Sequence, residues 1–201
     1  MRKNLAIVFL SLTFLIPAVS HAARDYGRSP LDYGGQVYLT IKYGETTIAD
    51  SVPENGSDIR NLGFVFGKGI NDVLAMEFEY TTTVSKDDDY GGSDLSASTD
   101  ILGLFLVAKT AGDIYVRGRI GYTRVTQDFG SSASGLFDDL SGQKNIYGVG
   151  YGVGAGYKFM KGGAVELEYM VYPTRDDVDF GGNEVDLEMD FISLNYVMSF
   201  D

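Results

Sequence analysis

The 201-residue chain contains no cysteine, no tryptophan, four prolines and a single histidine. Without cysteine it has no disulfide framework, no thiolate zinc site and no thiol nucleophile. Its 28 acidic and 16 basic residues give a formal net charge of −12, so it lacks the positive charge that a nucleic-acid partner requires. The apolar fraction of 44% is ordinary and argues against disorder. We therefore expect an ordered, acidic protein that does not bind nucleic acid.

Residues 1–22 are predicted to form a secretory signal peptide. Two basic residues precede an apolar run over residues 5–19, and Ser20-His21-Ala22 then places small residues before a cleavage site. The run is shorter than the roughly 20 residues of a spanning helix, which disfavours the alternative of a membrane anchor. Cleavage after Ala22 would remove the only histidine, which excludes Ser-His and Cys-His catalysis and imidazole metal ligation. We expect no enzymatic activity, no metal and no cofactor.

The rest of the chain alternates between apolar and polar residues. No segment shows a sustained helical period, whereas period-2 alternation, the signature of β-strands, recurs. Residues 23–35 are predicted as a short periplasmic segment and residues 36–201 as one β-domain. The eight alternating segments are residues 36–43, 60–68, 73–82, 100–109, 113–125, 146–159, 164–173 and 187–200. In the last segment Leu187, Met189 and Phe191 run out of phase with the residues that follow, which predicts a β-bulge near Phe191.

The connections between these segments differ in length. Three are tight turns, at residues 69–72, 110–112 and 160–163, and four are long, polar and acidic, at residues 44–59, 85–99, 126–144 and 174–186. Short and long connections alternate, so all long loops would share one end of an up-and-down meander. The predicted fold is therefore all-β, an eight-stranded antiparallel up-and-down β-barrel.

Alternation alone does not say whether the apolar face points into the barrel or out of it. A soluble barrel would bury that face, and an outer-membrane barrel would turn it toward lipid. Aromatic residues lie near the strand ends on the apolar face, as at a membrane interface; they are Tyr43, Tyr80, Tyr122, Tyr157 and Phe200. Most segments also supply the roughly 9–11 residues that a tilted strand needs to cross a bilayer. We therefore predict a transmembrane barrel in the bacterial outer membrane.

The polar face would then line a bore just wide enough for side chains. The sixth segment contributes a glycine stripe there, consisting of Gly148, Gly150, Gly152, Gly154 and Gly156. Counting from the tight turns places three cations and four acids near one level of the bore; they are Lys42, Glu77, Glu79, Arg117, Arg119, Glu166 and Glu168. Because unpaired charges in a low-dielectric bore are costly, we predict a paired layer that closes the pore and can gate it. The alternative is that these charges face water on a soluble sheet.

Two motifs carry a resemblance to a known group. They are the run GVGYGVGAGYKF at residues 148–159 and the final segment ISLNYVMSF at residues 192–200. From residue 36 to residue 200 the chain resembles the small eight-stranded outer-membrane barrels of the opacity-protein-like, porin-family group, which are similar in shape to the OmpA transmembrane domain. The resemblance implies that the barrel-assembly machinery reads the terminal strand, here through Tyr196, Met198 and Phe200. Asp201, which follows Phe200, departs from the usual aromatic end.

Two further patterns are weaker. Asp177, Asp179 and Glu188 match positions of a calcium-binding loop, but the flanks are strand-like and acidic chains produce such matches easily, so no metal site is predicted. The pairs Glu77/Glu79 and Glu166/Glu168 suggest a glycosidase, but each pair points into a bore too narrow for sugar.

Three functional hypotheses follow. The first is a structural or surface-interaction protein whose four long loops contact a host, a phage or a neighbouring cell, with Asp87–Asp89 and Asp138-Asp139 as solvated loop charges that attract divalent cations. The second is a narrow channel for small solutes, gated by the charged layer. The third, a barrel enzyme, is disfavoured by the missing histidine. The partners expected are outer-membrane lipid, lipopolysaccharide and the assembly machinery, with the barrel a monomer.

Overall fold

The computed structural model of the chain describes residues 35–49, 57–86, 96–130, 142–160, 162–180 and 183–200. The predicted signal peptide, the segment before Gly35, the acidic runs at residues 87–89 and 138–139, and Asp201 lie outside the described residues. Within the described ranges, no helix has the length and hydropathy needed to cross a membrane.

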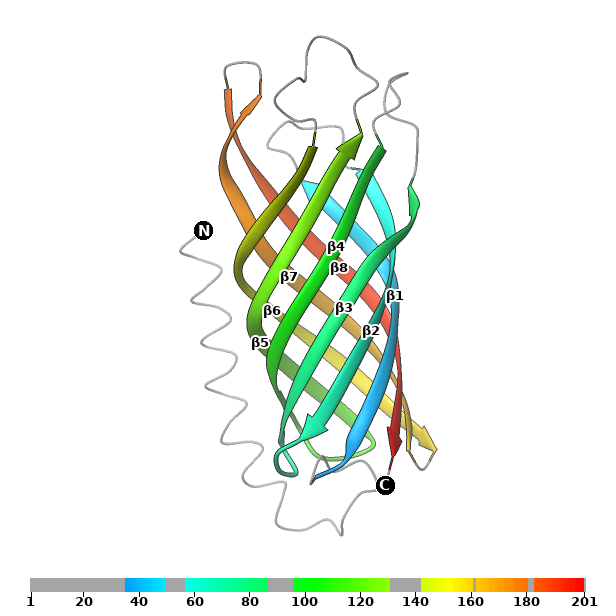
Figure 1. The fold of residues 1–201 in the computed structure, drawn as a ribbon. Coiled ribbons are helices and arrows are strands. Elements are labelled where there is room, and N and C mark those ends of the chain that lie inside the picture. Colours follow the sequence, from blue (N-terminus) through cyan, green and yellow to red (C-terminus); the bar gives the residue numbers. More distant parts are fainter. Residues whose placement is uncertain are drawn as a thin grey trace.

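Eight antiparallel strands close into one barrel in chain order, so that each strand pairs with its neighbours in sequence and β1 also pairs with β8 (Figure 1). This confirms the predicted fold class. The strands are β1 (Val37–Ala49), β2 (Ser57–Gly69), β3 (Leu74–Lys86), β4 (Ser96–Lys109), β5 (Ile114–Gly130), β6 (Gly142–Met160), β7 (Gly163–Phe180) and β8 (Asn183–Phe200). The tight turns and the end of β8 lie at one end, which we call the turn end, and the opposite end is the loop end (Figure 1).

The predicted apolar face is the outer face of the barrel. Large apolar side chains form a belt around the outside, and the five aromatic residues assigned to the membrane interface are between 43% and 61% exposed. Charged and polar side chains of the opposite face are buried inside instead. A folded protein with its apolar side chains outward needs hydrocarbon around it, because so large an apolar surface is not stable in water.

The strands extend farther toward the loop end than the sequence predicted. They run for 13 to 19 residues, and part of each range predicted as a long loop is strand; β7 reaches Phe180 and β8 already begins at Asn183. The alternation rule marks only the part of a strand that has one apolar face. Beyond the hydrocarbon neither face must be apolar, yet the backbone ladder continues, so these extensions have no alternating pattern.

The predicted bulge near Phe191 is wrong. The β1–β8 register runs without a shift from Val37↔Phe200 to Ala49↔Glu188. Met189 and Phe191 are apolar because they fill the interior, where both side chains are fully buried. The phase of the apolar pattern changes because these two interior positions are occupied by apolar side chains. The β7–β8 ladder shifts register between Tyr172 and Arg175, opposite Met189 and Leu187, but the extra residue lies on β7, so β8 itself remains regular.

Neighbouring strands of the barrel are not hydrogen-bonded to each other along their full length at every pair. Among the described residues, the β6–β7 ladder ends toward the loop end at Tyr151↔Val171. Beyond that pair β6 stays bonded to β5 as far as Gly142, and β7 stays bonded to β8 as far as Phe180. Pro173, two residues beyond Val171, has no amide hydrogen to donate and so interrupts the ladder there. Figure 1 shows the β7–β8 hairpin leaning away from the top of β6.

We predict that a lysine on the outer face is costly in proportion to its depth. Leu104 lies on the outside of β4, five residues from the end of the strand at Lys109, and is 53% exposed. Leu104→Lys should lower the free energy of unfolding by about 2–4 kcal/mol, and Val84→Lys, near the loop end, by about 0–1 kcal/mol. Urea titration of barrels refolded in phospholipid vesicles measures both. Equal costs would contradict a hydrocarbon-facing belt.

Candidate functional site

The most unusual feature of the interior is a cluster of charged side chains, which we call the ion layer. It consists of the seven residues singled out by the sequence: Lys42, Glu77, Glu79, Arg117, Arg119, Glu166 and Glu168. All seven are at most 3% exposed. They come from alternate strands, with the cations on β1 and β5 and the acids on β3 and β7. Side chains of alternate strands share layers in small barrels, so each cation has an acid two strands away on either side.

Arg117 bridges the two acidic strands at the turn-end side of the layer. One terminal nitrogen lies 2.7 Å from Glu77 on β3, and the other lies 2.6 Å from Glu166 on β7. The contact with Glu77 crosses β4, and the contact with Glu166 crosses the glycine-rich strand β6. The Arg117 guanidinium therefore links β3, β5 and β7, which are not neighbours in the sheet.

Arg119 and Lys42 complete the network. Arg119 forms ion pairs with Glu77 at 3.0 Å, with Glu168 at 3.1 Å and with Glu79. Lys42 lies 3.1 Å from Glu79 and 2.8 Å from Glu168. Every acid of the layer is therefore paired with at least one cation, and all seven groups belong to one connected network.

Tyrosine hydroxyls donate hydrogen bonds to carboxylate oxygens of the ion layer. The layer has four acids and three cations, and three buried tyrosines donate hydrogen bonds to the acids. Tyr38 donates to Glu77 at 2.8 Å, Tyr115 to Glu166 at 2.7 Å and Tyr172 to Glu79 at 2.9 Å. These donors occupy carboxylate lone pairs that the cations leave over, which a buried anion requires.

Aromatic rings cover the cations. The Lys42 ammonium lies 5.1 Å from the centroid of the Phe191 ring, and the Arg119 guanidinium lies 4.2 Å from that of Phe105. Both distances are within the range of cation–π attraction. Phe105 and Phe191 belong to a cluster of buried apolar side chains that extends to both sides of the layer, with Ala75 toward the turn end and Ile59 toward the loop end. The bore is thus blocked twice, by the ion layer and by apolar packing.

The glycine stripe of β6 provides the room for this packing. A Cβ added at Gly156 would overlap the Tyr115 ring, and one at Gly152 would overlap the Met170 sulfur. At Gly154 an added Cβ would lie 3.3 Å from Arg117 Cγ. Side chains from β5 and β7 therefore lie over the backbone of β6. The two remaining glycines of the stripe face Thr123 and Pro173, at Gly150 and Gly148 respectively.

Sequence reasoning located the charged residues but missed the tyrosines that complete the layer. Tyr38, Tyr115 and Tyr172 alternate in phase with Lys42, Arg117 and Glu168 on their own strands, so the inward phase itself was the available signal.

Two other predictions concern residues away from the bore. Tyr196, Met198 and Phe200 lie on the outer face of β8, and their role in assembly stays a prediction. Asp177, Asp179 and Glu188 fall within β7 and β8 and not in a loop between helices. In the ranges that the structure describes, no group of three or more His, Cys, Asp or Glu side chains is arranged to hold a metal ion.

Comparison with known proteins gives a consistent picture. A family model described as "Outer membrane protein beta-barrel domain" matches residues 8–200. A search of curated protein sequences finds no significant match. Neisserial surface protein A has a similar solved structure, with 15% identity, a TM-score of 0.55, and coverage of 87% of this chain and 100% of that chain.

Two further solved structures are similar. Ail, the attachment invasion locus protein of Yersinia pestis, is 11% identical with a TM-score of 0.53, covering 82% of this chain and 99% of its own. OprG from Pseudomonas aeruginosa is 12% identical with a TM-score of 0.52, covering 84% of this chain and 98% of its own. At these identities the likeness is one of fold.

We predict that breaking the ion layer destabilises the barrel. Arg119→Met removes a partner of Glu77, Glu79 and Glu168. It should lower the free energy of unfolding by about 3–5 kcal/mol, because three buried carboxylates each lose one cationic partner and the layer is left with four acids against two cations. Adding Glu79→Gln should restore part of that loss. The exposed Arg124 is the control, since Arg124→Met should change stability by no more than about 0.5 kcal/mol. Equal effects at the two arginines, in urea titrations, would contradict the network.

A second pair of variants tests the glycine stripe. Gly152→Ala should lower the free energy of unfolding by about 1–3 kcal/mol, because its methyl group has no room beside Met170. Gly118→Ala, on the outer face of β5, meets no atom closer than 3.9 Å and should stay within about 0.5 kcal/mol of the wild type. A harmless Gly152→Ala, measured by the same titration, would mean that the bore has spare volume.

Proposed function

The chain belongs to the outer membrane protein β-barrel domain family, and from this premise we propose that it is a closed barrel acting as a structural or surface-interaction protein. The family and the barrels of similar fold place it in the bacterial outer membrane. In this proposal residues 1–22 direct export, the turn end faces the periplasm and the loop end faces the outside of the cell.

The observation that carries the proposal is the closure of the bore. Seven buried charges are paired with one another at a single level, and buried apolar side chains, among them Phe105 and Phe191, pack against that layer. A solute crossing this barrel would have to separate several ion pairs in a region without bulk water, which is a large barrier. A barrel filled in this way supports a role as a rigid scaffold for the connections at its loop end.

The displayed elements would be the connections at the loop end, which are rich in acids. Asp87–Asp89 and Asp138-Asp139 concentrate negative charge there in the sequence. Such connections would attract cationic surfaces, or divalent ions that bridge them to anionic ones. The proposal includes no enzymatic activity, because the segment after residue 22 has neither histidine nor cysteine and the buried carboxylates are already engaged.

The alternative is a narrow channel gated by the ion layer. The observation that favours a channel is that ion pairs and hydrogen bonds hold the layer together, and charged groups in such a network can exchange partners. It differs from the closed barrel in one measurable property, its conductance.

Planar-bilayer recording tests the proposal. The wild-type barrel should show no sustained current. The fourfold variant Arg117→Ala, Arg119→Ala, Glu77→Ala and Glu79→Ala removes two cations and two acids, so it opens the layer without changing its net charge. It should conduct, and Arg124→Ala, on the outside, should not. Folding of each variant is checked by the faster electrophoretic migration of the unboiled barrel.

A large, steady current in the wild type would overturn the closed-barrel proposal and support the channel. A folded fourfold variant without current would show that the apolar cluster alone seals the bore. In that case the ion layer would be structural and would not act as a gate.

A further inference from the structure

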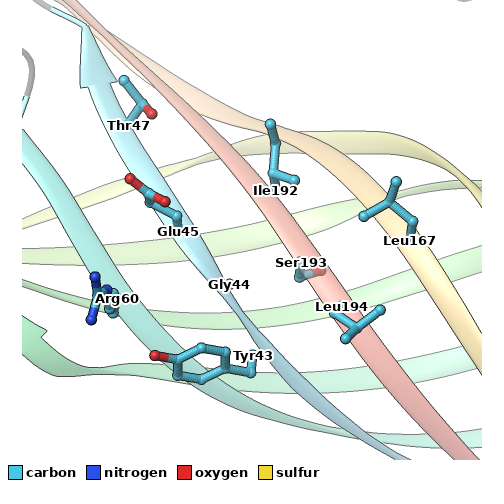
Figure 2. A pocket seen from close by; sticks show the side chains of 9 residues that line it. All are labelled: Tyr43, Gly44, Glu45, Thr47, Arg60, Leu167, Ile192, Ser193 and Leu194. Carbon is cyan, nitrogen blue, oxygen red and sulfur yellow. The ribbon is translucent and has the colours of Figure 1, made fainter.

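The longest unpaired strand edges in the described ranges border the seam between β6 and β7. Beyond Tyr151↔Val171 each of these strands runs for nine more residues without a ladder pair between them. The closing seam differs, because β8 stays paired with β1 along the full length of β1, and the two strands lie side by side in Figure 2. At the β3–β4 seam only four residues of each strand extend past the last pair, and the Thr83 hydroxyl there bonds to the Thr99 backbone.

Of the two edges at this seam, that of β6 is the more regular. Its ladder with β5 runs without a register shift from Tyr157 to Gly142. The ladder between β7 and β8 shifts register twice over the corresponding stretch, and Pro173 has no amide hydrogen to donate. Bulges and prolines blunt a strand edge, whereas a regular edge is a ready template for pairing with another strand.

Alternate residues of β6 present their backbone polar groups to the seam. The Lys158 amide donates to the Asp113 carbonyl, on the β5 side. Because backbone groups alternate sides along a regular strand, the even-numbered residues bond to β5. Asn145, Tyr147 and Val149 therefore direct both N–H and C=O away from β5, to the side where the described residues supply no ladder partner. We call these three residues the β6 edge.

The β6 edge lies outside the hydrocarbon. Tyr151 is nine residues and Val171 eight residues from the turn-end limits of their strands. A strand crosses the hydrocarbon in about 9–11 residues, so the β6–β7 ladder closes across the bilayer and ends near its limit. Unpaired backbone groups are excluded from hydrocarbon, but water satisfies them. In the orientation of the proposed function, on which this inference rests, the β6 edge faces the outside of the cell.

We propose that the β6 edge binds an extended, basic peptide segment of an extracellular partner, which adds to the sheet as a strand. Main-chain hydrogen bonds to Asn145, Tyr147 and Val149 hold the segment. Tyr147 and Val149 are 58% and 54% exposed on the outer face of the barrel, so apolar residues at alternate positions of the segment pack beside them.

The sequence on the other side of the seam determines the charge of the partner. Residues 174–188, which span the β7–β8 hairpin beyond Pro173, contain six acidic residues and one basic residue. Figure 1 shows this hairpin leaning away from β6, so a strand added to β6 lies between the two. Lysine or arginine side chains of that strand are attracted to the hairpin, whereas acidic ones are repelled. A second copy of this acidic chain is disfavoured for the same reason.

An octapeptide of alternating valine and lysine, blocked at both ends and carrying a fluorophore, is the probe. Barrels are reconstituted in nanodiscs of phosphatidylcholine, because headgroups without net charge do not attract the peptide. Fluorescence anisotropy at physiological ionic strength measures the dissociation constant. The wild-type barrel should bind this peptide, and it should not bind a peptide with glutamate in place of lysine.

Two substitutions at Tyr147 separate its backbone from its side chain. Tyr147→Pro removes the N–H that faces the seam and leaves the β5 ladder intact, as an edge strand allows. It should weaken peptide binding about tenfold, because a hydrogen bond is lost and the proline ring interrupts the added strand. Tyr147→Ala keeps the N–H and should weaken binding less than about threefold. Faster electrophoretic migration of the unboiled barrel checks that both variants fold.

Hydrogen exchange tests the same contact in the wild-type barrel, without any substitution. Bound peptide should slow exchange of the amides of Asn145, Tyr147 and Val149 about tenfold or more, because each becomes hydrogen-bonded. NMR of the barrel in nanodiscs measures these amides one by one. Binding that leaves their exchange unchanged would overturn strand addition.

A matched pair of charge variants tests the role of the hairpin. Asp176→Asn, Asp177→Asn and Asp179→Asn together should weaken peptide binding about tenfold. The control neutralises the same number of acids where β1 joins β2 in the sequence; it combines Asp50→Asn, Glu54→Gln and Asp58→Asn. The control should weaken binding less than about threefold.

Three other results would overturn the proposal. They are absence of peptide binding to the wild type, equal effects of proline and alanine at residue 147, and equal effects of the two charge variants. The last result would identify a general attraction to the acidic connections. Peptide binding requires no closed bore and no ion flow, so failure here is distinct from failure of the closed-barrel proposal in the conductance recording.

Discussion

The narrowness of an eight-stranded bore is the constraint on which the rest of the structure depends. A side chain pointing inward cannot reach bulk water, so a charge placed there must find its partner across the bore. Cations on β1 and β5 facing acids on β3 and β7 satisfy that requirement, because each charge meets opposite charges on strands two positions away. Between the acidic strand β7 and the basic strand β5 lies β6, whose glycines keep that path free.

Compared with a soluble protein, the distribution of apolar and charged side chains between the inside and the outside is reversed only in part. The outside is apolar because its surroundings are hydrocarbon, and the inside combines one charged layer with one apolar cluster. Tyr172 belongs to that cluster and donates to Glu79, and Phe191, also in it, lies over Lys42. The apolar cluster and the ion layer are therefore in direct contact, and a substitution in one of them removes a contact made by the other.

The sequence was most informative where one rule governed a whole strand. Alternation identified eight strands and the face of each, because lipid on one side and a crowded bore on the other impose opposite requirements on neighbouring residues. It could not give the loop-end limits of β7 and β8, since beyond the bilayer both faces meet water. It also misjudged Phe191, because an apolar residue on the inner face looks the same as a change of phase.

The ion layer could be located from the sequence for a different reason. Charged residues on an otherwise apolar strand are rare, and the distance from a tight turn sets their height. The individual pairs were beyond reach, because the stagger of the strands decides which glutamate each arginine meets. The tyrosine donors were missed because a hydroxyl carries no formal charge, although Tyr38 and Tyr115 alternate with Lys42 and Arg117 on the same inner face.

The end of the β6–β7 ladder at Pro173 gives the molecule a defined order of opening. The β3–β4 ladder also stops short of the loop end, at Thr82↔Asp100, but it leaves only four residues of each strand beyond that pair, whereas β6 and β7 each extend nine residues beyond Tyr151↔Val171. Regions with fewer bonds open at lower free energy than the rest of a structure. Separation of the strands therefore begins at this seam and stops near Tyr151 and Val171, where the ladder resumes and the interior contacts begin.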